Sequence, residues 1–133
     1  MNSNLMAEVL IDTSAWIAFF RGHEPLASRV DAALADGSAA VCGMIELEVL
    51  QNVRPGEEDV RSLMRSTLRL RTDEADYREA GERLAGLRRR GVTLPVTDGL
   101  IAQVALRYQV PLLEFDKHFE HIEDLVRIAW RAS

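Results

Sequence analysis

The sequence predicts one α/β domain over residues 1–133, built as a three-layer α/β/α sandwich around a central parallel sheet. Short apolar runs, several of them rich in β-branched residues, alternate with amphipathic stretches of helical length. A parallel return between strands needs a crossover connection of that length. The 133 residues are 47% hydrophobic and 28% charged, which is typical of a single globular domain with its own core. No linker, repeat or low-complexity segment divides the chain.

The first half of the chain predicts two strands, each followed by helix. Residues 8–11 form a short apolar run that ends at Asp12, after which apolar residues resume at helical spacing. Pro25 is suited to open a second helix. A second strand is expected over residues 39–42, and another helix begins near Gly43.

The middle of the chain predicts further helices and one ambiguous segment. Residues 57–70 show helical spacing, but a short strand over residues 68–71 competes with the end of that helix. Residues 73–90 form the clearest amphipathic helix, which Gly91 ends. The sequence therefore leaves helix and strand open near residue 68.

The next helix is the most apolar one in the sequence. Residues 93–96 are expected to form a loop, and Thr97 and Asp98 are both suited to cap a helix over residues 99–108. This stretch is apolar on all sides, so we expect the helix to be buried. A strand over residues 111–115 and a last strand over residues 126–130 complete the prediction, the first of them ending at Asp116.

Two acidic residues follow predicted strands. Asp12 and Asp116 each come directly after an apolar strand, and ligands of open parallel sheets bind beyond the carboxyl ends of the strands. Each aspartate taken alone is more often a helix cap than a metal ligand. Several carboxylates at one place, however, require a compensating cation, and oxygen ligands favour Mg²⁺ or Mn²⁺. Zinc is not expected, because the chain has no Cys pair and no His-Glu-x-x-His motif.

Four blocks in a fixed order carry a resemblance to a known family. They are Val9-Leu10-Ile11-Asp12-Thr13-Ser14-Ala15-Trp16-Ile17, Glu48-Val49-Leu50-Gln51-Asn52, Thr97-Asp98-Gly99-Leu100-Ile101-Ala102 and Phe115-Asp116-Lys117-His118-Phe119. With these blocks the chain resembles the PIN domains, and among them the VapC-type toxins of bacterial toxin–antitoxin pairs. The resemblance covers nearly the whole length.

The resemblance implies a metal-dependent ribonuclease. Asp12, Glu48, Asp98 and Asp116 would be the catalytic acids that bind Mg²⁺ or Mn²⁺, and Thr13 or Ser14 would support them through a hydroxyl group. RNA would be the substrate, a VapB-type antitoxin the partner, and a homodimer the usual assembly. The aromatic first helices offer a surface for such a partner, although core packing is the more common use of such side chains and is preferred here.

Two further acids, Glu46 and Glu114, lie close to members of this set in the sequence. Glu46 and Glu48 begin the same predicted helix, and residues two apart on a helix point about 200° away from each other, so only one can enter the site. The family pattern favours Glu48, with Glu46 in reserve, although Asn52 stands where the family usually has glycine. Asn tolerates the left-handed backbone expected there. Glu114 either supports the metal-binding acids from behind or lies at the protein surface.

The charge of the chain limits how it could hold RNA. Sixteen Lys and Arg against twenty-one Asp and Glu give a net charge of −5, so RNA must be held locally by metal ions or by a basic surface. Candidate basic residues are Arg61, Arg65, Arg69, Arg71 and Arg88-Arg89-Arg90, which are equally compatible with a solvated helix face. His118 and His121 are expected at the surface, with substrate contact as the alternative.

Localisation and rival functions complete the sequence-based expectations. With no apolar run of membrane-spanning length and no signal-like N-terminus, a cytoplasmic location and no membrane contact are expected. Cys42 lies in an apolar run and reads as a small core residue. A non-catalytic PIN-like scaffold or RNA-binding module is the main alternative function. An aspartyl-phosphate phosphatase is disfavoured, because Ser14 stands where such enzymes place a second Asp.

Overall fold

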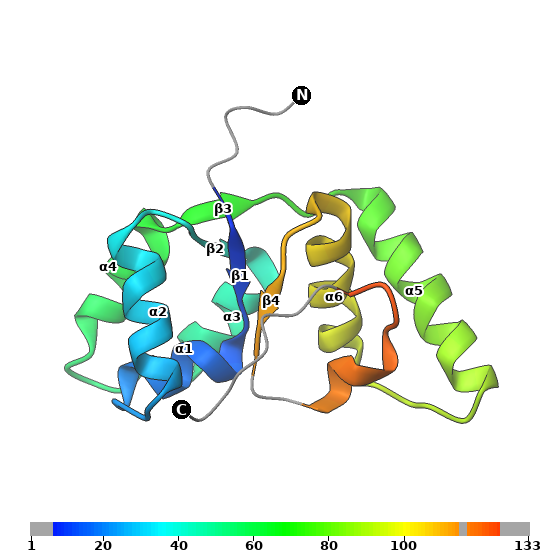
Figure 1. Cartoon of the computed structure of the whole chain (residues 1–133), viewed down its shortest axis with the longest axis horizontal. Coiled ribbons are helices and arrows are strands. Elements are labelled where there is room, and N and C mark those ends of the chain that lie inside the picture. Colours follow the sequence, from blue (N-terminus) through cyan, green and yellow to red (C-terminus); the bar gives the residue numbers. More distant parts are fainter. Residues whose placement is uncertain (1–6, 115–116, 126–133) are drawn as a thin grey trace.

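The computed structural model describes residues 7–114 and 117–125, which form the predicted α/β/α sandwich (Figure 1). Four parallel strands in the described residues form one sheet in the order β3-β2-β1-β4. The strands are β1 (Val9–Ile11), β2 (Ala39–Cys42), β3 (Leu68–Leu70) and β4 (Leu112–Leu113). The helices are α1 (Thr13–Phe20), α2 (Leu26–Ala35), α3 (Gly43–Gln51), α4 (Glu58–Ser66), α5 (Glu74–Arg89), α6 (Val96–Tyr108) and the short 3₁₀ helix η1 (Lys117–His121).

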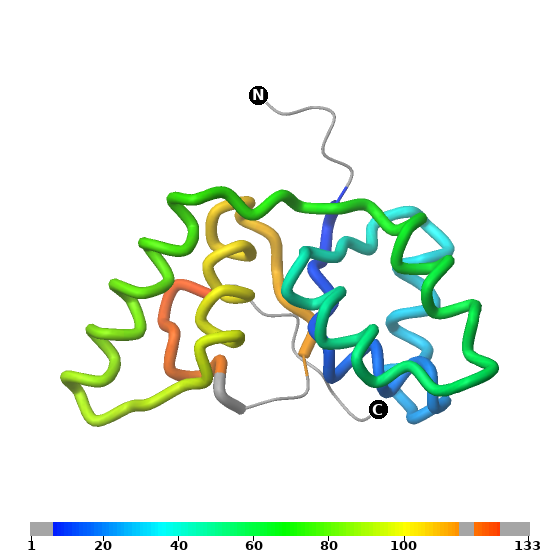
Figure 2. The backbone as a smooth tube through the Cα atoms, turned by 180° about the vertical axis from the view of Figure 1, so that it is seen from behind, coloured from blue at the N-terminus to red at the C-terminus, as the bar shows by residue number. Residues whose placement is uncertain are grey.

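The helices cover both faces of the sheet. Helices α1, α2 and α4 lie on one side of it and α5 and α6 on the other, as both views show (Figures 1 and 2). Helix α3 contacts α1 and also α6. Strands β1 and β2 are buried along their whole length, which is expected of a parallel sheet covered on both faces. No helix in the described ranges 7–114 and 117–125 combines the length and apolar character of a membrane span.

The order of the strands creates a switch point beside β1. From β1 the chain runs outward through β2 to β3, and then crosses to the opposite edge to form β4. Strands β1 and β4 are therefore neighbours whose connections leave in opposite directions. Ligands of open α/β sheets bind in the crevice at the carboxyl ends of such a pair. A ligand is therefore expected beside the residues that follow Ile11 and Leu113.

Most predicted elements of the first two thirds are confirmed. Strand β2 has the predicted bounds, Pro25 precedes α2, and Gly91 ends α5 with a positive φ of 84°. Near residue 68 both competing elements form, one after the other: α4 ends at Ser66, and β3 begins at Leu68. Cys42 is fully buried, and this burial raises the pKa of its thiol to about 11.

The start of the buried helix differs from the prediction. Helix α6 begins at Val96, with Pro95 at the N-cap, so Thr97 and Asp98 are not caps and residue 96 does not belong to the loop. The fixed φ of proline and its missing N–H suit the entry to a helix, which explains the earlier start. Asp98 therefore sits in the first turn. The predicted burial is confirmed, because every residue from 98 to 105 is buried.

The aromatic residues of α1 serve mainly the core. Trp16 is fully buried and stacks on Phe20 with ring centroids 6.0 Å apart, and Leu26 is also buried. Phe19 and Phe20 are half-buried and pack against the same core.

The outcome differs for the last two predicted strands. Strand β4 is confirmed at residues 112–113, whereas Asp116 and the predicted strand over 126–130 lie outside the described residues.

Candidate active site

Asp12 is held at the carboxyl end of β1 by both the sheet and the next helix. Its backbone N–H donates to the carbonyl of Leu113 in β4, at 2.9 Å. Its side chain caps α1: Oδ2 accepts hydrogen bonds from the backbone N–H of Ser14 at 3.2 Å and from the Ser14 hydroxyl at 2.7 Å. Asp12 is therefore both a helix cap and an acid at the switch point of the sheet.

The environment of Asp12 makes its negative charge costly. The side chain is only 4% exposed, and this burial raises the pKa of Asp12 to about 6. The hydrogen bonds from Ser14 oppose that shift, and the nearby charge of Asp98 adds to it. A carboxylate in this position gains from any cation placed between it and Asp98, because a cation would offset both the lost hydration and the mutual repulsion.

Glu48 reaches the same end of the sheet from α3. The hydroxyl of Thr13, the residue after Asp12, donates to Oε1 of Glu48 at 2.7 Å. The expected hydroxyl support is thus seen for both candidates, since Ser14 bonds to Asp12 and Thr13 bonds to Glu48. Two consecutive residues of α1, Thr13 and Ser14, thus hold the carboxylates of Glu48 and Asp12.

Glu46 points to a different neighbour, as expected for a residue two positions away on one helix. Its carboxylate pairs with Arg69 of β3. The explanation offered for Asn52 is wrong: its φ is −97°, outside the left-handed region. Instead, Nδ2 of Asn52 donates to the backbone carbonyl of Glu48 at 2.8 Å and so completes the end of α3.

Asp98 and Glu114 complete the described acids at this end. Asp98, in the first turn of α6, is 9% exposed and close enough to Asp12 to raise its pKa. Glu114 directly follows β4 and is 8% exposed. The surface alternative for Glu114 is therefore wrong. Its position two residues before Asp116, at the end of a strand, was the available signal for its burial.

The described acids do not by themselves form a closed metal site. Within residues 7–114 and 117–125, no group of three or more His, Cys, Asp or Glu side chains is placed to bind a metal ion. The two acids that interact electrostatically, Asp12 and Asp98, carry only oxygen donors, which fit Mg²⁺ or Mn²⁺ and do not fit zinc. The fourth predicted acid, Asp116, lies outside the described residues.

One hollow of the surface is lined by none of these acids. It has a volume of about 460 Å³ and lies between the end of α5 and the segment after η1. Arg83, Arg89, Arg90 and His121 are among its lining residues. Arg83 was not among the basic residues singled out from the sequence. Its spacing of seven from Arg90 was the available signal, because residues seven apart lie on the same face of a helix.

Comparison with known proteins identifies the family to which these features point. The family model for the PIN domain matches residues 9–125. A VapC ribonuclease of Mycobacterium bovis, Mb1587, is 30% identical over 127 residues, which cover 90% of this chain and 95% of that protein. Ribonuclease VapC11 of Mycobacterium tuberculosis matches with the same identity and coverage.

Solved structures share the fold. The VapBC2 complex of Rickettsia felis, bound to a DNA fragment from its promoter, matches with a TM-score of 0.74 and 18% identity, over 92% of this chain and 98% of that one. VapBC-1 of nontypeable Haemophilus influenzae matches with a TM-score of 0.73 and 21% identity, over 92% and 97%. The four-stranded parallel sheet and its flanking helices are therefore an arrangement seen in known toxin–antitoxin structures.

Proposed function

This chain belongs to the PIN domain family, and from that premise we propose that it is an endoribonuclease toxin that uses a divalent metal, Mg²⁺ or Mn²⁺. The observation that carries the proposal is the pair Asp12 and Asp98. Both are buried at the switch point of the sheet, where burial raises the pKa of Asp12 and the charge of Asp98 adds to that shift. The 30% identity to VapC ribonucleases over nine tenths of the chain supports RNA as the substrate.

In this proposal the acids have separate roles. Asp12 and Asp98 hold the cation, and Ser14 keeps the Asp12 carboxylate oriented through two hydrogen bonds. Glu48, fixed by Thr13, binds the cation directly or orients the attacking water. Asp116 is proposed as the fourth acid. When bound, the divalent cation supplies a lowered pKa for the attacking water and stabilises charge on the phosphoryl oxygens.

Substitution of the acids tests this assignment. Asp12→Asn, Asp98→Asn and Glu48→Gln should each reduce RNA cleavage in Mg²⁺ or Mn²⁺ by at least about a hundredfold, the order of magnitude associated with losing a group that activates the nucleophile. Glu46→Gln is the matched control, because Glu46 lies on the same helix but pairs with Arg69. Cleavage is measured on purified protein with and without EDTA.

Metal binding supplies a second readout that does not require activity. Calorimetric titration with Mn²⁺ should show binding to the parent and to Glu46→Gln, and much weaker binding to Asp12→Asn. If Asp12→Asn cuts RNA as fast as the parent, the catalytic role is wrong. If the parent binds RNA but never cleaves it, the alternative of a non-catalytic module replaces the proposal.

The partner is proposed to be a VapB-type antitoxin. The support is that the solved structures sharing this fold include VapBC complexes. We also propose a homodimer, with the half-buried Phe19 and Phe20 on α1 leaving apolar surface that a partner could cover. Sedimentation of the purified chain tests the dimer, and a monomer at all concentrations contradicts it. Co-expression with a small DNA-binding protein encoded next to this gene tests the antitoxin.

A further inference from the structure

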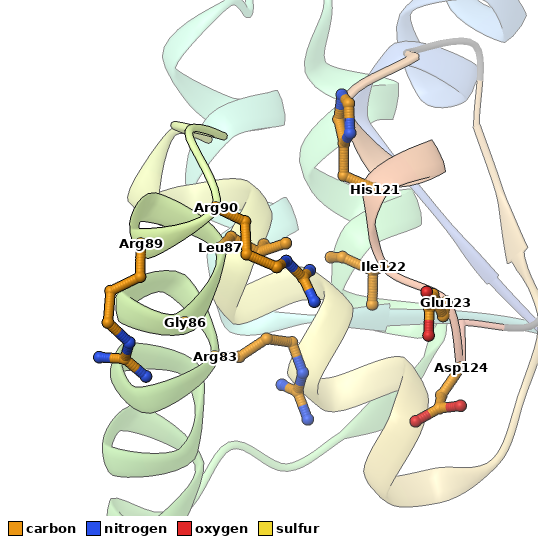
Figure 3. Close-up of a pocket in the computed structure, with 9 residues that line it drawn as sticks. All are labelled: Arg83, Gly86, Leu87, Arg89, Arg90, His121, Ile122, Glu123 and Asp124. Carbon is orange, nitrogen blue, oxygen red and sulfur yellow. The ribbon is translucent and has the colours of Figure 1, made fainter.

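The cavity of about 460 Å³ at the end of α5 has a lining that is divided by chemistry (Figure 3). One wall comes from the last turns of α5 and carries Arg83 and Arg90. Leu87 and Ile122 supply buried apolar surface between the walls. The opposite wall, after η1, carries the exposed carboxylates of Glu123 and Asp124. The cavity is thus lined by positively charged, apolar and negatively charged side chains within one small volume.

The two arginines face the same space. They are seven residues apart on one helix, and Figure 3 shows both guanidinium groups turned toward the cavity, whereas Arg89 points away. Arg83 donates to Oε1 of Gln103 at 2.8 Å, and Arg90 is exposed. Neither takes part in the ion pairs seen among the described residues. Two like charges facing one cavity favour an anion between them, and arginine binds phosphate through paired hydrogen bonds.

The rest of the lining favours a nucleotide over a bare anion. Glu123 and Asp124 would repel free phosphate, but their oxygens can accept hydrogen bonds from ribose hydroxyls or from base amino groups. Leu87 and Ile122 are only 3% and 7% exposed, so they form the closed floor of the cavity and leave a small apolar area that the edge of a base can contact. An acidic peptide would satisfy the arginines, but it would be repelled by the carboxylates on the other wall. A phosphate joined to a sugar and a base uses all three parts of the lining.

Both walls connect directly to the proposed active site. Arg90 is followed by the short loop that leads into α6, whose first turn carries Asp98. On the other side, η1 begins at Lys117, directly after Asp116. Helix η1 also contacts α6. Each wall is therefore only a few residues along the chain from one of the proposed acids.

We propose that this cavity binds one nucleotide of the RNA substrate next to the scissile phosphate, with Arg83 and Arg90 holding its phosphate group. The inference rests on the proposed ribonuclease function. Arg90 is the better residue to change, because Arg83 also supports Gln103 between α5 and α6. The matched control is Arg88→Gln, since Arg88 is exposed in the same last turn of α5 but does not line the cavity.

Binding of small ligands tests the cavity without any cleavage. In NMR titrations, adenosine 5′-monophosphate should shift the side-chain Nε–Hε signals of Arg83 and Arg90 and the methyl signals of Ile122. Inorganic phosphate and adenosine should bind at least about tenfold more weakly, because each uses only part of the lining. Arg90→Gln should weaken binding of the nucleotide about tenfold, the effect of losing one hydrogen-bonded charge, and Arg88→Gln should not. Equal shifts with phosphate and nucleotide, or equal affinities in the two variants, overturn the proposal.

Cleavage of RNAs of different length tests whether the cavity binds part of the substrate during the reaction. The parent should cleave an RNA that extends beyond the scissile bond on both sides with a higher kcat/KM than a dinucleotide. Arg90→Gln should remove most of that gain, whereas Arg88→Gln should keep it. A gain that survives in Arg90→Gln overturns the subsite. If the parent cleaves no RNA, the proposed function fails, and the NMR titration still decides whether the cavity binds a nucleotide.

Discussion

The hydroxyl of Thr13 donates a hydrogen bond of 2.7 Å to Oε1 of Glu48, a residue 35 positions later in the chain. Thr13 is the first residue of α1, and Glu48 lies near the middle of α3. The contact fixes one carboxylate of the candidate site from the residue that follows another, Asp12. The hydroxyl is therefore a positioning group, and its removal should change the site without changing the fold.

Thr13→Val should lower ribonuclease activity about tenfold and the free energy of unfolding by no more than about 1.5 kcal/mol, so that the variant still folds. Valine keeps the shape of threonine but cannot donate to Glu48, and one such bond to a charged group contributes about 1.5 kcal/mol. Thr13→Ser keeps the hydroxyl and should restore most of the activity. Steady-state cleavage of an RNA substrate and urea denaturation measure the two quantities. Equal loss in the valine and serine variants would contradict a role for the hydroxyl.

Asp12 should make the metal-free protein less stable as the pH rises. Its pKa is raised by burial from 3.8 to about 6, so the folded protein binds the proton more tightly than the unfolded chain does. The stabilisation is complete below pH 3.8 and is lost as the pH rises through about 6. The difference amounts to about 3 kcal/mol.

Comparison of the parent with Asp12→Asn isolates this effect from the other carboxylates. Urea denaturation in EDTA should show that the asparagine variant becomes more stable relative to the parent between pH 4 and pH 7. Excess Mn²⁺ should reverse the order at pH 7, because only the parent gains from binding the cation. A difference between the two proteins that does not vary with pH contradicts the raised pKa.

Asp76 has the opposite pH dependence, although it is also buried. Burial alone would raise the pKa of Asp76, but its hydrogen bonds lower it below 3.8. They come from the backbone of Asp73 at 2.7 Å, from Gln103 at 3.1 Å and from Arg107 at 2.7 Å. Its stabilisation is therefore present above pH 3.8 and is lost as the pH falls through the lowered pKa.

Arg107→Gln should lower the free energy of unfolding by about 2 kcal/mol at pH 7, because it leaves the buried Asp76 without its cation. The loss should shrink in acid, where Asp76 is protonated. The control is Arg71→Gln, whose ion pair with Asp73 is long at 3.6 Å and whose side chain is 81% exposed. That change should cost less than about 0.5 kcal/mol. Equal costs for the two arginines would mean that burial of Asp76 does not matter.

Gly99→Ala should destabilise the packing of α6 against α5. A Cβ atom at residue 99 would lie 2.6 to 2.8 Å from three side-chain atoms of Leu84, which is too close for carbon atoms. Overpacking of this kind costs about 1 to 3 kcal/mol. Thermal denaturation measures the loss, and Leu84→Ala in the same chain should recover part of it.

Gly81→Ala is the control for that substitution. Gly81 lies inside α5, and a Cβ atom there would meet nothing within 4 Å. Alanine at that position should stabilise the protein by about 0.5 to 1 kcal/mol, because it restricts the unfolded chain and favours helix. If Gly99→Ala is as well tolerated as Gly81→Ala, the close approach to Leu84 is not a constraint.

The parts of the fold that were predicted well are those with a local signal. Strand β2 follows from one short apolar run, and α5 follows from its periodicity and from Gly91. The start of α6 was placed three residues late, because Pro95 competes with Thr97 and Asp98 as the entry to a helix. Short-range preferences alone do not rank such neighbours, since proline, threonine and aspartate each suit the start of a helix.

The sequence by itself determined the order of strands and helices and the presence of Asp12 at the end of a buried strand. It also favoured Glu48 over Glu46 through a resemblance. Only the tertiary structure decided that Glu48 accepts a hydrogen bond from Thr13 and that Glu46 pairs with Arg69. It also raised the pKa of Asp12 and turned Arg83 and Arg90 toward one cavity. The physical reason is distance along the chain. Periodicity and capping act over a few residues, whereas burial and charge depend on residues that meet only when the sheet and its helices have assembled.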